Sequence, residues 1–399
     1  MKIKKLILLF SILLMVKSYA QGSSAVPFLS LQQSPFLQGA GATGVAVITE
    51  DPLGFYYNPA ILGVTAKTNH ISTLFLTKKT EWIGIPDFNT NSYGLNIGYN
   101  LEGKLPISLG FGFIHNEINY NYYGNNENSF SCFSLGAGFN YPVIFSLGFS
   151  VKKFSSILTS YPIANPSQIY KLSSTAYDLG ALLDIPVSTL FLDNVSFKLD
   201  EASSITPNLN FIIGYSITNL GKEVYYVDKS QMDPIPRTAK LGYSLNLGAD
   251  FHISDKTIAA FEYTFVAEAS DLLPELDSNF NTSYKGPLGD INIGRNLIQL
   301  KYSSNTIIHK AHIFNIFETV KLAFGNFVGS GYEYNPKTSA IVISTEGIFK
   351  LLNNQAGNSV LGFITYHFGI EYTASKIFKD TSLETKYSAI SIFFNNFEL

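Results

Sequence analysis

The chain has 399 residues, of which 14% are aromatic but only 14% charged, and it contains 31 glycines. Its formal net charge is −3 and its arginines are Arg237 and Arg295, a balance that argues against nucleic-acid binding. The single cysteine, Cys132, excludes an intrachain disulfide framework and is expected to be a buried thiol. This glycine-rich, aromatic and weakly charged composition favours an all-β fold.

The first twenty residues predict a secretory signal peptide. Lys2, Lys4 and Lys5 precede an apolar run over residues 6–16, and Ser18 and Ala20 supply small residues before a cleavage point. Removing residues 1–20 takes away four lysines and shifts the net charge from −3 to about −7. No later apolar run reaches about 18 residues, so a transmembrane helix is not expected. A periplasmic protein, a secreted protein and an outer-membrane barrel all remain open.

A small-residue stretch follows at 34–63. Gly39, Gly41 and Gly44 spell the Gly-x-Gly-x-x-Gly pattern of dinucleotide-binding folds. That pattern needs a preceding strand and a following helix, whereas Pro52 and Pro59 interrupt any long helix here. The glycines therefore predict tight backbone packing. We expect residues 21–66 to form a compact hatch, or plug.

The rest of the chain, 67–399, alternates between apolar and small polar residues. The most regular runs are 93–101, 107–113, 131–141, 143–151 and 241–249. Because strand side chains alternate between faces, one face is apolar and the other is Gly, Ser and Asn. An apolar face suits lipid, a face of small residues leaves room in a lumen, and only a closed sheet pairs every backbone group within a membrane.

Ten weaker runs bring the candidates to about fifteen. Barrels of this class have even strand numbers, so we predict fourteen strands, with sixteen as the alternative. The weaker runs are 68–77, 80–85, 176–186, 209–220, 257–268, 291–303, 311–326, 338–350, 360–373 and 385–397. Turns are expected at 102–104, 125–128 and 353–358, and long connections at 159–174 and 269–288.

No motif indicates catalysis or a cofactor. The histidines are scattered, and the one close pair, His309 and His312, would face opposite sides of a strand. No Gly-x-Ser-x-Gly element is present. We therefore predict a protein that is not an enzyme and holds neither metal nor cofactor.

Two stretches carry a resemblance to a known family. Residues 39–63 read Gly-Ala-Gly-Ala-Thr-Gly, then Glu50-Asp51, then Phe-Tyr-Tyr-Asn-Pro-Ala at 55–60, and residues 214–243 contain Asn-Leu-Gly, Asp-Pro-Ile-Pro and Leu-Gly-Tyr. In this order they resemble the PorV/PorQ group of the FadL-like outer-membrane proteins. The chain departs from the group by lacking an Arg near Gly39 and by ending in Leu399.

The resemblance implies a 14-stranded barrel of the bacterial outer membrane with a hatch in its lumen. It further implies a part in type IX protein secretion, with secreted cargo or other secretion components as partners. The alternatives are a FadL-like channel for long-chain fatty acids or other hydrophobic molecules, and a structural barrel. Hatch residues expected to contact a ligand or gate the lumen are Gly39, Gly41, Gly44, Phe55, Asn58 and Pro59. An apolar ligand path and a packed hatch core are both compatible with Phe36, Leu37, Leu53, Phe55 and Ile61.

Overall fold

The computed structural model describes residues 24–78, 80–81, 88–101, 106–120, 126–159, 170–191, 195–200, 203–253, 256–277, 281–350 and 359–397. The predicted signal peptide and the turns predicted at 102–104 and 353–358 lie outside these residues.

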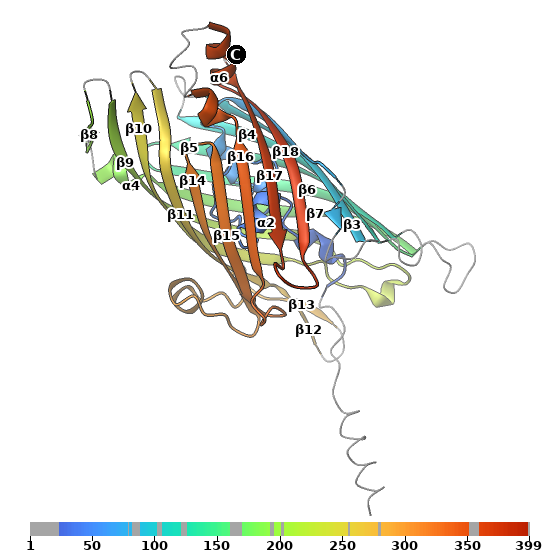
Figure 1. Cartoon of the computed structure of the whole chain (residues 1–399). Helices are drawn as coiled ribbons and strands as arrows, with labels where there is room; N and C mark the ends of the chain where they lie inside the picture. Colours follow the sequence, from blue (N-terminus) through green and yellow to red (C-terminus); the bar gives the residue numbers. More distant parts are fainter. Residues whose placement is uncertain are drawn as a thin grey trace, which may run out of the picture.

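Fourteen antiparallel strands close into a barrel, which confirms the predicted fold class (Figure 1). The ring is closed by β1 (His70–Leu76), which pairs with both β3 (Phe88–Asn100) and β18 (Thr385–Asn395). The other ring strands are β4 (Ile107–Tyr120), β5 (Asn126–Asn140), β6 (Ile144–Thr159), β7 (Tyr170–Ile185), β9 (Ser203–Gly221), β10 (Thr238–Ile253), β11 (Lys256–Leu272), β14 (Thr306–Ile316), β15 (Val320–Gly329), β16 (Lys337–Ser344) and β17 (Phe368–Ile377). Two-residue strands, β2 (Thr80–Glu81) and β8 (Phe197–Lys198), pair onto β3 and β9 outside the ring.

The two faces of the wall have the predicted chemistry. On β3, Asn96 is buried on the inner face, whereas Tyr93 lies on the opposite, outer face and is 46% exposed. On β5, Ser134 is buried, whereas Phe133 and Leu135 are 50% and 61% exposed. A contiguous apolar outer surface of this kind is the lipid-facing band of a transmembrane barrel.

The N-terminal segment, residues 24–66, packs against the inward face of the wall (Figure 1, blue). It is built from short turns: η1 (Pro27–Ser30), α2 (Pro35–Gly39), η2 (Gly54–Tyr56) and α3 (Ile61–Thr65). Helix α2 contacts β15 to β18, and α3 contacts β3 to β6 on another part of the ring. The segment therefore bridges strands that are far apart in the sequence.

Two long connections, residues 222–237 and 273–305, lie at one end of the barrel. They include η4 (Lys229–Gln231), the β12 (Pro274–Leu276) and β13 (Thr282–Tyr284) hairpin, and the π-helical turn η5 (Ile293–Ile298). The opposite end carries α4 (Val187–Phe191) and α6 (Ser359–His367). Among the described residues, no helix is long and apolar enough to cross a membrane.

Several predicted boundaries are wrong. Residues 311–326 form two strands, because Phe317 and Glu318 adopt left-handed φ angles of 50° and 51° in a tight turn without glycine or proline. Residues 360–373 begin as helix α6, and only β17 continues as strand.

Three further boundaries moved for packing reasons. Residues 291–303 alternate like a strand but contain η5, and Ile291 and Leu297 pack on the outer wall. Residues 126–128 of the turn predicted at 125–128 are the start of β5, where Asn128 faces inward and donates to Ile118 O (3.4 Å). The first long connection is shorter than predicted, since β7 begins at Tyr170, whereas the second is longer, since it runs from the end of β11 at Leu272 to the start of β14 at Thr306.

Candidate functional site

A row of inward-facing glycines forms the seat of the N-terminal segment. Gly110, Gly136, Gly148 and Gly180 lie opposite one another on β4, β5, β6 and β7. A Cβ atom at Gly110, Gly148 or Gly180 would lie 2.2, 2.2 or 2.0 Å from the nearest atom of residues 58–63. Any side chain in this row would displace the segment, so the glycines fix how closely it approaches the wall.

Asn58 and Pro59 lie directly on this row. The Asn58 amide donates to Val45 O (2.7 Å) and Ala181 O (3.1 Å), and its oxygen accepts from Ala60 N (3.1 Å). The side chain is fully buried. Asn58 therefore joins two parts of the segment to strand β7.

Gly39 and Gly41 contact the opposite wall. The Gly41 N–H donates to Thr338 Oγ1 (2.8 Å), and the Thr338 hydroxyl donates to Gly39 O (2.6 Å). Gly41 has a φ of 74°, and a Cβ there would lie 2.5 Å from Lys310 O. His309 Nδ1 lies 2.8 Å from Gly41 O, so that nitrogen carries the proton. This confirms close backbone packing at two of the three predicted glycines.

The third glycine lies in a small anion site that is filled by the protein itself. The Glu268 carboxylate accepts from Gly44 N (2.8 and 3.1 Å), Val45 N (2.8 Å) and Ala46 N (3.3 Å). Successive backbone N–H groups that converge in this way form a concavity suited to an anion. Glu268, which lies inward on β11, thus fills this concavity with a carboxylate of the protein itself.

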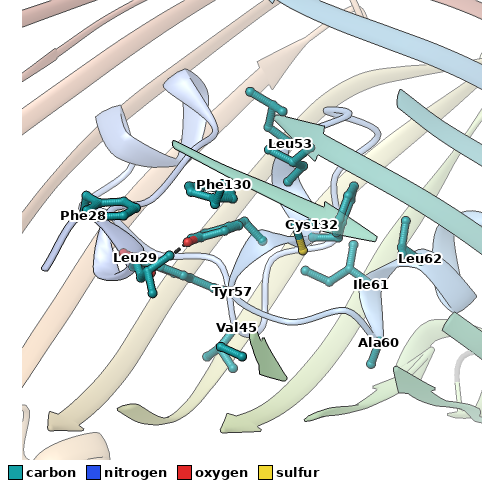
Figure 2. Close-up of a cluster of buried hydrophobic side chains, with 14 of the residues drawn as sticks. Phe28, Leu29, Val45, Leu53, Tyr57, Ala60, Ile61, Leu62, Phe130 and Cys132 are labelled. Carbon is teal, nitrogen blue, oxygen red and sulfur yellow. Dashed lines mark hydrogen bonds between the residues drawn. The ribbon is translucent and has the colours of Figure 1, made fainter. Parts of the chain in front are cut away.

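Phe55 belongs to the largest buried cluster (Figure 2). Its ring lies over Gly112, where a Cβ would be 2.4 Å away, and Tyr56 stacks on Phe130 with ring centroids 5.3 Å apart. Leu53 and Ile61 share this cluster, while Phe36 and Leu37 belong to a second one. Packing of the segment therefore accounts for these five apolar residues. Cys132 lies in the same cluster and is buried, as predicted.

A buried ion pair, absent from the sequence expectations, also holds the segment. Lys152 Nζ lies 2.8 Å from Asp178 Oδ2, with both side chains fully buried, and 4.0 Å from the centre of the Tyr56 ring. Asn219 bridges the pair, since its amide oxygen accepts from Lys152 (3.1 Å) and its N–H donates to Asp178 (2.7 Å). No sequence pattern indicates this pair, because these residues come from three different strands.

Asp51 braces the segment internally. Its carboxylate accepts from the Ser34 hydroxyl and from Leu53 N (2.8 Å), and Ser34 Oγ in turn caps α2 by accepting from Leu37 N (3.0 Å). Burial raises the pKa of Asp51 to about 6, although these hydrogen bonds act in the opposite direction.

Two cavities lie on either side of the segment. The first, which we call the chamber, has a volume of about 460 Å³ and opens beside the longer connections. Its aromatic lining consists of Tyr57, Phe327, Tyr332, Phe378 and Tyr387, and its polar lining includes Thr238, Lys240, Ser270 and His309.

Lys240 is the cation of the chamber. It is 6% exposed, and its Nζ lies 3.8 Å from the centre of the Tyr57 ring. Among the described residues it forms no ion pair within 4.0 Å, because the nearby Glu268 is directed at the backbone of residues 44–46. A buried ammonium beside aromatic rings is a strong site for an anionic group.

The second cavity, which we call the vestibule, has a volume of about 530 Å³ and polar walls. The chamber is lined by Lys240 on β10 and by His309 on β14. The vestibule is lined by Ser244 on β10 and by Ile313 on β14. Glu268 lies between the two cavities on β11. The loop at residues 41–46 therefore divides the lumen.

The six predicted site residues are thus brought together as packing and hydrogen-bonding groups of one segment. The chamber is lined by other residues, chiefly Tyr57, Lys240 and the aromatic residues on strands β15 and β18 and in the connections after β15 and β17. Within the described residues, no group of three or more metal-ligating side chains occurs.

No protein-family model and no curated protein matches the chain. Among solved structures, it is similar to a Pseudomonas aeruginosa FadL homologue, with 8% identity, a TM-score of 0.40, and coverage of 91% of this chain and 99% of that one. It is also similar to the CymD monoaromatic hydrocarbon channel, with 10% identity, a TM-score of 0.40, and coverage of 91% of this chain and 96% of that one. A TodX monoaromatic hydrocarbon channel mutant has 10% identity and a TM-score of 0.36, with coverage of 92% of this chain and 99% of that one. None of these TM-scores exceeds 0.40, so function must be argued from the geometry of the lumen.

Proposed function

We propose that the protein is a FadL-like channel of the bacterial outer membrane that takes up a hydrophobic molecule bearing an anionic group, such as a long-chain fatty acid. The observation that carries this proposal is the chamber, which combines an aromatic wall with one buried ammonium, Lys240. Its volume of about 460 Å³ lies in the range typical of small-molecule sites.

In this proposal the anionic group pairs with Lys240, and the apolar tail lies against Phe327, Tyr332 and Phe378. Residues 21–66 act as a hatch, and passage requires the loop at 41–46 to leave the wall. The hatch is held by directional hydrogen bonds at Glu268 and Thr338, which can break and reform without loss of the glycine seat.

Binding of oleate to the purified protein tests the proposal. Lys240→Met keeps the length of the side chain and removes its charge. Since a hydrogen bond to a charged group contributes about 1.5–3 kcal/mol, we expect oleate affinity to fall roughly ten- to hundredfold. The control is Lys171→Met, which removes an exposed lysine of β7 that is not among the chamber residues. Equal affinity in the two variants would reject the chamber as the binding site.

The secretion role implied by the PorV/PorQ resemblance remains a prediction, with its own test. Deleting the gene and measuring both fatty-acid uptake and cargo release separates the two functions. Lost uptake with normal secretion supports the channel, whereas retained cargo with normal uptake supports the secretion component.

A further inference from the structure

The connection between β11 and β14 folds over the outside of the barrel. Three strand residues beside inward-facing chamber residues point outward: Ala239 beside Lys240, Ala269 beside Ser270, and Ile308 beside His309. All three are nevertheless fully buried. They are covered by a cluster that includes Leu273, Ile291 and Leu297 of this connection. We call residues 285–303 the outer loop.

Two outward tyrosines fix how far the outer loop reaches along the wall. The Tyr215 hydroxyl donates to Pro287 O (2.7 Å), and the Tyr243 hydroxyl lies 3.4 Å from Leu297 O. Tyr243 is five residues from the start of β10 at Thr238, which corresponds to roughly 17 Å along the strand. The loop thus lies beside the wall rather than above the rim.

The outer loop is rigidly braced on its inner side. Lys285 pairs with Asp271 (3.1 Å) and Asp290 (2.7 Å), and the buried Asn296 donates to Lys301 O (2.8 Å) and Thr306 Oγ1 (3.2 Å). These bonds brace the loop internally, and Lys285 engages both Asp290, the acidic residue of the loop, and Asp271 at the end of β11.

The outer side of the loop is apolar and basic. Ile298 is 74% and Ile293 56% exposed, and both flank the exposed Arg295. Lys301 is also exposed. Among the described residues, neither Arg295 nor Lys301 forms an ion pair within 4.0 Å. Two large isoleucines turned away from the protein, beside such cations, are typical of segments that lie in a membrane interface.

This surface is continuous with the lipid-facing wall. An apolar groove of about 770 Å³ lies on the outside of β4 to β9. It is lined by Tyr215, which donates to the outer loop, and by Ile217, which packs against the cluster that the loop covers. The groove is bordered by exposed Leu135 and Leu179. Lipid that covers this groove would meet the edge of the outer loop.

We propose that the outer loop is a membrane-interface anchor. Ile293 and Ile298 enter the acyl region of the adjoining leaflet, and Arg295 and Lys301 bind lipid phosphate groups. The proposal rests on the transmembrane barrel and is independent of what the chamber binds.

Fluorescence quenching in nanodiscs that hold one copy of the protein tests the anchor. In a Trp82→Phe background, Ile298→Trp places a reporter on the outer loop, and Val227→Trp places one on the β9–β10 connection at the same end, where Val227 is 51% exposed. With brominated phosphatidylcholine, we expect severalfold stronger quenching and blue-shifted emission for Ile298→Trp. Ile293→Trp provides a second reporter if the first does not yield a heat-modifiable barrel.

Lipid charge gives a second measurement. With phosphatidylglycerol added to the discs, Arg295→Gln/Lys301→Gln should lower the bromine quenching of the Ile298→Trp reporter toward the Val227→Trp value. Emission at the wavelength of an aqueous indole, with iodide quenching equal in both reporters, would overturn the proposal.

Discussion

Replacement of Glu268 by alanine should release the loop that divides the lumen. The carboxylate accepts hydrogen bonds from three buried backbone N–H groups of residues 44–46, at 2.8 to 3.3 Å. Each N–H left without a partner costs about 1–3 kcal/mol, but water from the chamber would recover part of this. Removing a buried carboxylate also relieves its own desolvation. We therefore expect a net loss of about 2–4 kcal/mol in the local stability of the loop.

Hydrogen exchange measured by mass spectrometry in nanodiscs reports this opening directly. A loss of 2–4 kcal/mol corresponds to roughly thirty- to several-hundredfold faster exchange in peptides covering residues 41–48, with the barrel strands unchanged. The matched control is Glu262→Ala, since Glu262 lies on the same strand and the same inward face but accepts from Asn315 (2.7 Å). Unchanged exchange in Glu268→Ala, or an equal increase in Glu262→Ala, would refute the role of Glu268.

Two further predictions concern the seat and the bracing of the segment. Gly148→Ala would place a Cβ 2.2 Å from the carbonyl carbon of Pro59, whereas in the control Gly369→Ala the nearest atoms would lie 3.7 Å away. We therefore expect Gly148→Ala alone to lose about 1–3 kcal/mol of stability, seen as a lower temperature at which the band of the unheated protein disappears from the gel. Equal midpoints in the two variants would contradict the glycine seat. Asp51 has a pKa raised from 3.8 to about 6, so the folded state holds this proton more tightly than the unfolded state. The corresponding stability is present below pH 3.8 and is lost as pH rises to about 6, by at most roughly 3 kcal/mol. Thermal midpoints of the wild type should fall over this window and those of Asp51→Asn should not; parallel curves would show that another group is responsible.

The barrel wall was predictable because the lipid environment imposes a strict rule on each strand. Leu135 and Ser134 alternate between lipid and lumen, and this two-residue period is visible without any knowledge of strand partners. Boundaries failed where tertiary packing overrides the local pattern. The turn at Phe317 and Glu318 has no turn residue to mark it, and Ile291 and Ile293 alternate with small polar residues although they belong to a loop.

The seat of the N-terminal segment was partly predictable, and the chamber was not. Gly39, Gly41 and Gly44 signalled close packing because few other residues tolerate such contacts, whereas nothing in the sequence indicated that Asn58 and Pro59 lie on the row of wall glycines. Lys240, in contrast, follows a proline-rich connection and starts an ordinary alternating strand. Its importance arises only when the barrel closes and brings Phe327, Tyr332 and Tyr387 opposite it.

Photochemical labelling of the chamber tests the central claim most directly. A fatty acid with a photoreactive diazirine near its tail, irradiated with the purified protein and mapped by mass spectrometry, should label Phe327, Tyr332 or Phe378. Oleate should compete for this labelling, and Lys240→Met should reduce it at low probe concentration. Labelling that falls instead on vestibule residues such as Asp184 and Asn210, or that is indifferent to oleate and to Lys240→Met, would contradict the account.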